Sequence, residues 1–133
     1  MLFRNEYAFL SNMYPCSITL NGLTFSCAEA VFQAYKCGKH EDVLALTKMS
    51  GIEAKAFGRK VKMRSDWNTF RLIAMRNVIK AKFTQHPELL KKLKAIDVPI
   101  IEDNTWNDRY WGKCNGIGEN NLGIILDEMK HML

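Results

Sequence analysis

The dipeptide of Asn21 and Gly22 places the firmest constraint on the fold of this chain. Asn-Gly is the preferred sequence of a type I′ turn, in which both central residues take a positive φ. The flanking residues 17–20 and 23–26 alternate apolar and polar side chains, as two half-buried strands require. The sequence therefore predicts a two-stranded antiparallel hairpin over residues 17–26.

Most of the remaining chain carries helix signals. Ser26 with Glu29, and Ser50 with Glu53, have the spacing of capping boxes, and Asp66 stands before a long stretch of apolar residues at helical spacing. The sequence also contains a short apolar strand candidate at residues 98–101. Residues 102–121 are rich in Asn, Gly, Asp and Trp, which predicts a long ordered loop. The expected helices cover residues 28–37, 41–49, 51–57 with an extension to 60, 67–83, 87–93 and 122–132.

These elements predict an α+β fold in one domain over residues 1–133, dominated by helices and with a small antiparallel β-sheet. A chain of 133 residues with 47% hydrophobic and 25% charged residues has the size and composition of one globular domain. No apolar run approaches the roughly 18 to 20 residues of a membrane-spanning helix. The first residues lack the basic and apolar regions of a secretory signal. We therefore expect a cytoplasmic protein with no membrane partner.

Cysteine and histidine spacing argues against a metal site. The four cysteines form no C-x-x-C pair and the three histidines are scattered. We therefore expect free thiols, no metal and no cofactor. The net charge of +5 favours anionic partners such as phosphates, nucleotides or nucleic acid. Residues 55–64 contain five basic side chains and no acidic one, which is equally typical of a solvated helix face.

Two segments combine side chains that could carry chemistry. Glu29, Gln33 and Lys36 are spaced i, i+4 and i+7, which places them on one face of a helix. The alternative is an amphipathic helix whose polar stripe faces water and whose Glu29 only caps it. Residues 102–112 gather three acids and three aromatic rings, and such groups bind ribose hydroxyls, activate water or stack on bases. The alternative here is a turn-rich loop whose tryptophans fill the core.

Two further segments carry weaker signals. Residues 9–15 hold Ser11 and Asn12 just before the hairpin, a pattern that most often marks a plain turn. Gly116 and Gly118 form a Gly-x-Gly before the last helix, but no clear strand precedes them. A dinucleotide-binding fold of the Rossmann type is therefore excluded.

Taken in order along the chain, these segments resemble the YbiA/NADAR family. Two departures stand out: Ala30 occupies the position of a common histidine that pairs with the family's glutamate, and residues 94–97 replace a Thr-Gly before the acidic loop. Cys114 is the single cysteine after Trp111 and Gly112, where some relatives carry more. The matching segments are residues 6–15, 25–36, 54–59, 66–67, 75–83, 102–112 and 121–123.

The resemblance implies a single α+β domain and N-glycosidase chemistry. Members of the family are associated with ribosylaminopyrimidine phosphates of the riboflavin pathway or with ADP-ribose attached to guanine. We therefore expect a phosphorylated riboside, an ADP-ribosylated nucleobase or ADP-ribosylated nucleic acid as the partner. The residues to which the resemblance assigns function are Asn12, Glu29, Gln33, Lys36, Lys55, Arg59, Glu102, Asp108 and Trp111.

Cleavage of a C1–N bond builds positive charge on the ribose, so the site must place negative charge near C1. Glu29 and Asp108 are the expected carboxylates for that work. Lys36 either holds a phosphate or, if buried, forms a Schiff base with opened ribose. Glu29, Lys36, Asp108 and Trp111 are predicted to line one pocket, with Trp111 stacking on the base.

Asn12, Gln33 and Glu102 are the remaining expected contacts to the substrate. Lys55 and Arg59 suit its phosphate as charge-assisted donors. Two other functions stay open at this stage. One is a non-catalytic reader of ADP-ribose or nucleotides, and the other is a basic nucleic-acid-binding module.

Overall fold

The computed structural model describes residues 1–133. Its backbone contacts group into two compact units, one formed by Asn12–Gln85 and the other by Met1–Ser11 together with His86–Leu133. We call them the central unit and the terminal unit, and each is described by itself. The expectation of one domain over the whole chain stays a prediction.

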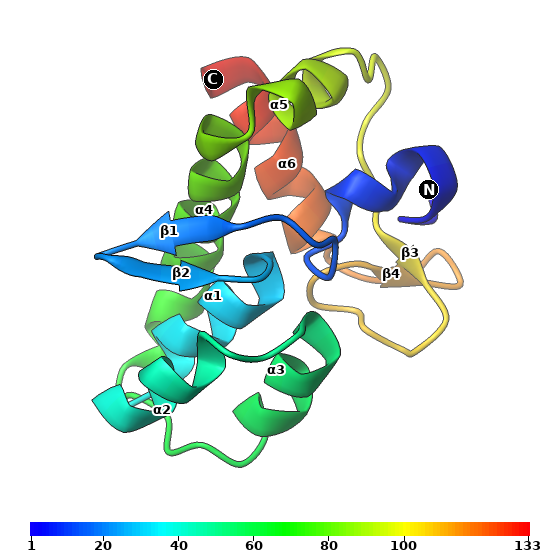
Figure 1. The fold of residues 1–133 in the computed structure, drawn as a ribbon. Helices are drawn as coiled ribbons and strands as arrows, with labels where there is room; N and C mark the ends of the chain where they lie inside the picture. The colour runs from blue at the N-terminus through cyan, green and yellow to red at the C-terminus, as the bar shows by residue number, and fades with distance from the viewer. The chain divides into compact units, whose positions relative to one another are not determined.

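The central unit begins with the predicted hairpin, which is confirmed (Figure 1). Strand β1 (Ile18–Leu20) pairs antiparallel with β2 (Leu23–Phe25). Asn21 and Gly22 between them have φ values of 52° and 79°, the left-handed conformation that a type I′ turn demands.

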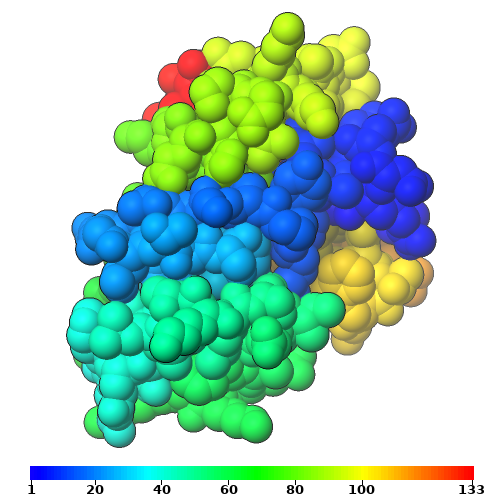
Figure 2. Space-filling model, viewed as in Figure 1, coloured from blue at the N-terminus to red at the C-terminus, as the bar shows by residue number.

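Four helices complete the central unit: α1 (Ala28–Lys36), α2 (His40–Leu46), α3 (Gly51–Gly58) and α4 (Trp67–Gln85). Helix α1 packs against the three others. Its contact with α4 includes Phe32 and Trp67, whose ring centroids are 5.1 Å apart. The hairpin segment lies against the segment that carries α2 and α3 (Figure 2). Helix α1 is therefore held on several sides, which fixes the direction of its side chains.

One of the two predicted capping boxes is confirmed and the other is wrong. The Ser50 hydroxyl accepts from the Glu53 amide, and the Glu53 carboxylate accepts from the Ser50 amide. Ser26, by contrast, does not cap α1, because its hydroxyl donates to the Met49 carbonyl at 2.6 Å. The N-cap of α1 is Cys27, which makes no side-chain cap bond. Glu29 is therefore not held in a capping box.

The terminal unit contains the 3-10 helix η1 (Asn5–Leu10), helices α5 (Pro87–Lys94) and α6 (Asn121–Met132), and the two-residue strands β3 (Asp103–Asn104) and β4 (Lys113–Cys114). Helix α5 packs against α6. The strands β3 and β4 pair in parallel, so the predicted loop contains a short regular element.

The predicted strand over residues 98–101 is wrong. The Ile100 amide donates to the Asp127 carboxylate at 3.0 Å, and its carbonyl accepts from the Asn120 side chain at 2.9 Å. Side chains of α6 and its N-cap therefore satisfy the backbone groups that a neighbouring strand would have used. The helix-rich chain with its small antiparallel sheet confirms the predicted α+β class. None of its helices is long and apolar enough to cross a membrane.

Candidate active site

Helix α1 presents the first group of predicted site residues. The Gln33 side-chain nitrogen donates to Oε1 of Glu29 at 3.0 Å, and the Lys36 Nζ donates to the Gly58 carbonyl at 2.7 Å. Gln33 is only 6% exposed. The polar stripe of α1 is therefore turned toward α3, and the alternative of a stripe that faces water is wrong.

Asn12 lies at the beginning of this helix. Its carbonyl accepts from the Glu29 amide at 2.9 Å, which ties residue 12 to the first turn of α1. Its buried side chain donates to the Met75 sulfur at 3.4 Å, a weak acceptor. Its Oδ1 has no hydrogen-bond partner. A buried acceptor without a partner costs about 1 to 3 kcal/mol, so Asn12 Oδ1 is suited to a donor from a bound ligand.

The predicted phosphate-binding cations belong to α3 and its end. Lys55 is half-buried in the helix, and the exposed Arg59 is its C-cap residue. Arg64, the last cation of the basic run, is instead engaged with Asp66 through a 2.6 Å ion pair and stacks over Phe70. Lys55 and Arg59 thus lie in α3 and at its C-cap, and the Gly58 carbonyl of the same helix accepts from Lys36. Arg64 has a structural role instead.

Asn104 organises the acidic loop of the terminal unit. Its Nδ2 donates to the Asp108 carbonyl at 2.8 Å and to Oε1 of Glu102 at 3.4 Å. Its Oδ1 accepts from the Asp108 amide at 3.0 Å. Glu102 and Asn104 are both buried. One amide side chain therefore links the two predicted acids, a role that the sequence analysis did not assign to Asn104.

Asp108 shapes the backbone that carries Trp111. Its Oδ1 accepts from the amides of Tyr110 at 3.1 Å and Trp111 at 2.9 Å. The Trp111 ring stands edge-on to that of Tyr110, with centroids 4.8 Å apart. One carboxylate oxygen of Asp108 is thus committed to loop structure, which leaves Oδ2 as its oxygen for a ligand.

Asn120 is a second structural residue that the sequence analysis missed. It takes a left-handed φ of 55° before α6. Its Oδ1 accepts from the Glu102 amide at 2.9 Å, and its Nδ2 donates to the Ile100 carbonyl. Asparagine tolerates the left-handed region better than most residues, and here it also fixes the backbone of Glu102. An Asn-Asn pair just before an apolar helix was the available signal.

The nine predicted residues therefore fall into two groups. The central unit brings together those of α1, α3 and the segment before α1, and the terminal unit brings together those of the acidic loop. The shared pocket of Glu29, Lys36, Asp108 and Trp111 stays a prediction. The first group is Asn12, Glu29, Gln33, Lys36, Lys55 and Arg59, and the second is Glu102, Asp108 and Trp111.

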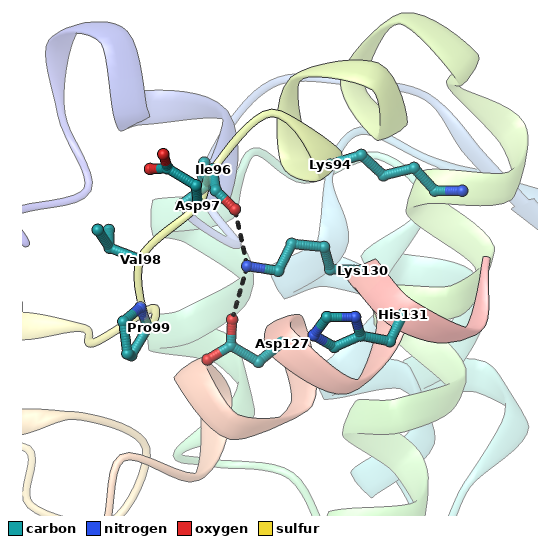
Figure 3. A pocket seen from close by; sticks show the side chains of 8 residues that line it. All are labelled: Lys94, Ile96, Asp97, Val98, Pro99, Asp127, Lys130 and His131. Carbon is teal, nitrogen blue, oxygen red and sulfur yellow. Dashed lines mark hydrogen bonds and ion pairs between the residues drawn. The ribbon is translucent and has the colours of Figure 1, made fainter.

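A cavity of ≈ 620 Å³ lies in the terminal unit but holds none of the nine residues (Figure 3). The Lys130 side chain crosses the cavity, and its Nζ donates to the Ile96 carbonyl at 2.8 Å. The same Nζ forms an ion pair with Asp127 Oδ1 at 3.3 Å. These charged groups join the segment after α5 to α6, so they serve packing in this unit. The lining residues are Lys94, Ile96, Asp97, Val98, Pro99, Asp127, Lys130 and His131.

Lys82 of α4 is a buried cation that the sequence analysis did not single out. Its side chain is fully buried, with Nζ 5.3 Å from the ring centroid of Phe83 and 5.8 Å from that of Tyr14. Burial lowers its pKa from 10.5 to about 8, and the neighbouring thiols of Cys16 and Cys27 oppose that shift. No group of three or more His, Cys, Asp or Glu side chains is arranged to hold a metal ion.

Comparison with known proteins identifies the family. The NADAR domain matches residues 2–133. N-glycosidase YbiA of Shigella boydii serotype 4 (strain Sb227) is 32% identical over 133 residues, covering 97% of this chain and 83% of that protein. Riboflavin biosynthesis protein VVA0006 of Vibrio vulnificus (strain YJ016) is 35% identical over 128 residues, covering 91% of this chain and 34% of that protein.

The fold agrees with these relatives. The NMR structure of YbiA from E. coli aligns with a TM-score of 0.88 at 30% identity, covering 99% of this chain and 83% of that one. The relatives named N-glycosidases confirm the prediction of a hydrolase that acts on N-glycosyl bonds. The chain belongs to the NADAR domain family.

Proposed function

We propose that the chain hydrolyses the C1–N bond of a phosphorylated riboside, with a ribosylaminopyrimidine phosphate or ADP-ribose attached to guanine as substrate. Both compounds join an amine-type leaving group to ribose C1 near a phosphate. The observation that carries the proposal is the set of polar side chains on α1, where Glu29 is paired with the buried Gln33 and Lys36 is fixed on Gly58.

Glu29 is the carboxylate proposed to meet the charge that develops at C1. A carboxylate on a helix is positioned more accurately than one on a loop. Gln33 holds its Oε1 at 3.0 Å, which orients the carboxylate for the ribose or for the attacking water. An anion placed in advance near the forming oxocarbenium stabilises the transition state more than the ground state, which is the condition for raising kcat.

Lys36 has two possible roles at this site, and its hydrogen bond bears on both. Its Nζ donates to the Gly58 carbonyl at 2.7 Å, so the amine is held near the end of α3. As a cation there it would bind a phosphate oxygen beside Lys55 and Arg59. As a nucleophile its neutral amine would attack C1 while the C1–N bond to the base breaks and the base leaves with a proton, giving a Schiff base with the opened ribose that water then hydrolyses.

Substrate contacts in the terminal unit are proposed for the acidic loop. Asp108 Oδ2 and the Glu102 carboxylate suit ribose hydroxyls, and Trp111 suits the face of the leaving base. Asn12 Oδ1, buried without a partner, suits an N–H or O–H of the substrate. Arg59, Lys60 and Lys62 are exposed at the end of α3. That charge would also favour ADP-ribosylated nucleic acid as a larger anionic substrate.

The names of two relatives support small-molecule substrates of riboflavin biosynthesis, because the proteins of Vibrio vulnificus and Zea mays carry that description. We therefore propose to present a ribosylaminopyrimidine phosphate and ADP-ribosylated guanosine to the same preparation. Mass spectrometry of the released base identifies the substrate. We also propose that the protein meets these substrates in the cytosol.

The test of the catalytic role is Glu29→Gln, which keeps the shape of the side chain and removes its charge. We expect kcat to fall by about 100-fold or more while substrate binding and the melting temperature are retained. Glu41→Gln is the matched control, because Glu41 is an exposed acid in the first turn of α2. Wild-type turnover in a folded Glu29→Gln variant would move the catalytic role to Asp108 or Glu102. Tight binding with no base released by the wild type would identify a reader.

A further inference from the structure

Gly58, the last residue of α3, packs directly on the functional face of α1. Gly58 is buried, and a side chain at position 58 would run into the side chain of Gln33. A methyl group added at Gly58 would collide with the Oε1 and Cδ atoms of Gln33 and would lie 3.1 Å from its Cγ. The carboxamide of Gln33 therefore occupies the space that any larger residue at position 58 would need.

The same glycine is also bound to Lys36. Its carbonyl accepts from Lys36 Nζ at 2.7 Å. Gly58 thus contacts two residues of α1 that lie three positions apart, Gln33 through its Cα and Lys36 through its carbonyl. Gln33 Nε2 donates to Glu29, one helical turn earlier in α1. A change at position 58 that moves the Gln33 side chain would therefore also move or release the Glu29 carboxylate.

We infer that Gly58 is a positioning residue for the proposed reaction, since it makes room for the Gln33 side chain that holds Glu29 and its carbonyl anchors Lys36. The inference rests on the proposed function. Gly58 has no unusual backbone angle, because the positive-φ glycines are elsewhere. Alanine is also the better helix former, so a purely local effect would stabilise α3. Only the contact with α1 demands glycine here.

The direct test is Gly58→Ala. The methyl group would push the Gln33 side chain away and break its bond to Glu29, because the far end of a glutamine moves more easily than two helices do. A hydrogen bond to a charged group that is lost in the transition state lowers kcat by roughly 10- to 100-fold. We expect that loss in kcat with little change in KM.

Gln33→Ala distinguishes positioning from general damage. It removes the same bond from Glu29, so it should lower kcat to a similar extent. The double variant should be no worse than either single variant, because both act through one contact. Gly51→Ala is the matched control, because Gly51 belongs to the same helix as Gly58. A methyl group at Gly51 would lie 2.6 Å from Met13 Sδ and 3.2 Å from Cys27 Sγ and would not contact Gln33. This control variant should lower the melting temperature and leave kcat unchanged.

Two results would overturn the inference. One is a folded Gly58→Ala variant with the kcat of the wild type, and the other is a double variant whose losses in kcat multiply. If the wild type releases no base from any N-riboside, the proposed function fails. The melting temperatures then still test the contact between Gly58 and Gln33. Gly58→Ala should then lower the melting temperature in the wild type but not in the Gln33→Ala background. Equal shifts in both backgrounds would refute the contact itself.

Discussion

Lys82 gives the free energy of unfolding a pH dependence that one variant can isolate. The amine is fully buried, and desolvation lowers its pKa from 10.5 to about 8. Between these two pH values the unfolded chain keeps the proton on Lys82 and the folded protein has lost it. Stability rises with pH wherever the unfolded state binds more protons. The cost of burying the charge is therefore fully present below pH 8 and disappears as the pH approaches 10.5.

The magnitude follows from the size of the shift. A difference between 10.5 and about 8 corresponds to about 3 kcal/mol, since one pKa unit is about 1.4 kcal/mol. Lys82→Met removes the titrating amine and keeps a side chain of similar length. We therefore expect the wild type to gain about 3 kcal/mol relative to this variant between pH 8 and 10.5.

The assay is urea unfolding of both proteins at several pH values across that range, followed by circular dichroism. Taking the difference between them cancels the ionisation of groups that both proteins share. Lys80→Met is the control, because Lys80 is exposed on the same helix and its difference from the wild type should stay flat. A flat difference for Lys82→Met as well would refute the burial argument.

Three smaller predictions follow from other parts of the chain. Ser50→Ala should lower the free energy of unfolding in urea by about 1 kcal/mol through loss of the capping box, whereas Ser65→Ala at an exposed turn should change it by less than about 0.5 kcal/mol. Asn104→Ala should cost about 2 to 4 kcal/mol in the same assay, because Glu102 and Asp108 lose hydrogen-bond partners in the buried part of the loop. EDTA should leave turnover unchanged, because the spacing of cysteine and histidine predicts no metal site; recovery of lost activity by one divalent ion would contradict this.

The elements that could be predicted are those specified by neighbouring residues. The Asn21-Gly22 turn requires only its own backbone angles, and the bond between Glu29 and Gln33 follows from the i, i+4 spacing of a helix. The Ser50 capping box is equally local. For such features the residues that make the contact lie within a few positions of one another, so the pattern is visible in the sequence.

The features that could not be predicted depend on partners far along the chain. Ser26 has the spacing of a cap, but the Met49 carbonyl takes its hydroxyl. Asn120 reaches back 18 residues to the Glu102 amide, and no periodicity marks that bond. Lys82 has the polarity of a surface residue, and only the packing of α4 shows that it is buried. In each case tertiary contacts override a local preference.

Ala30 occupies the position at which the resemblance to the family implies a histidine paired with the glutamate. A histidine at position 30 could not stand beside Glu29 on the polar face, because consecutive residues of a helix point about 100° apart. Ala30 is fully buried, so position 30 faces the core of the central unit. The hydrogen bond to Glu29 comes from Gln33, one helical turn along, on the face that Gly58 leaves open. Glutamine does not titrate, so the hydrogen bond that orients the proposed catalytic carboxylate persists across the pH range in which a histidine partner would gain or lose its charge.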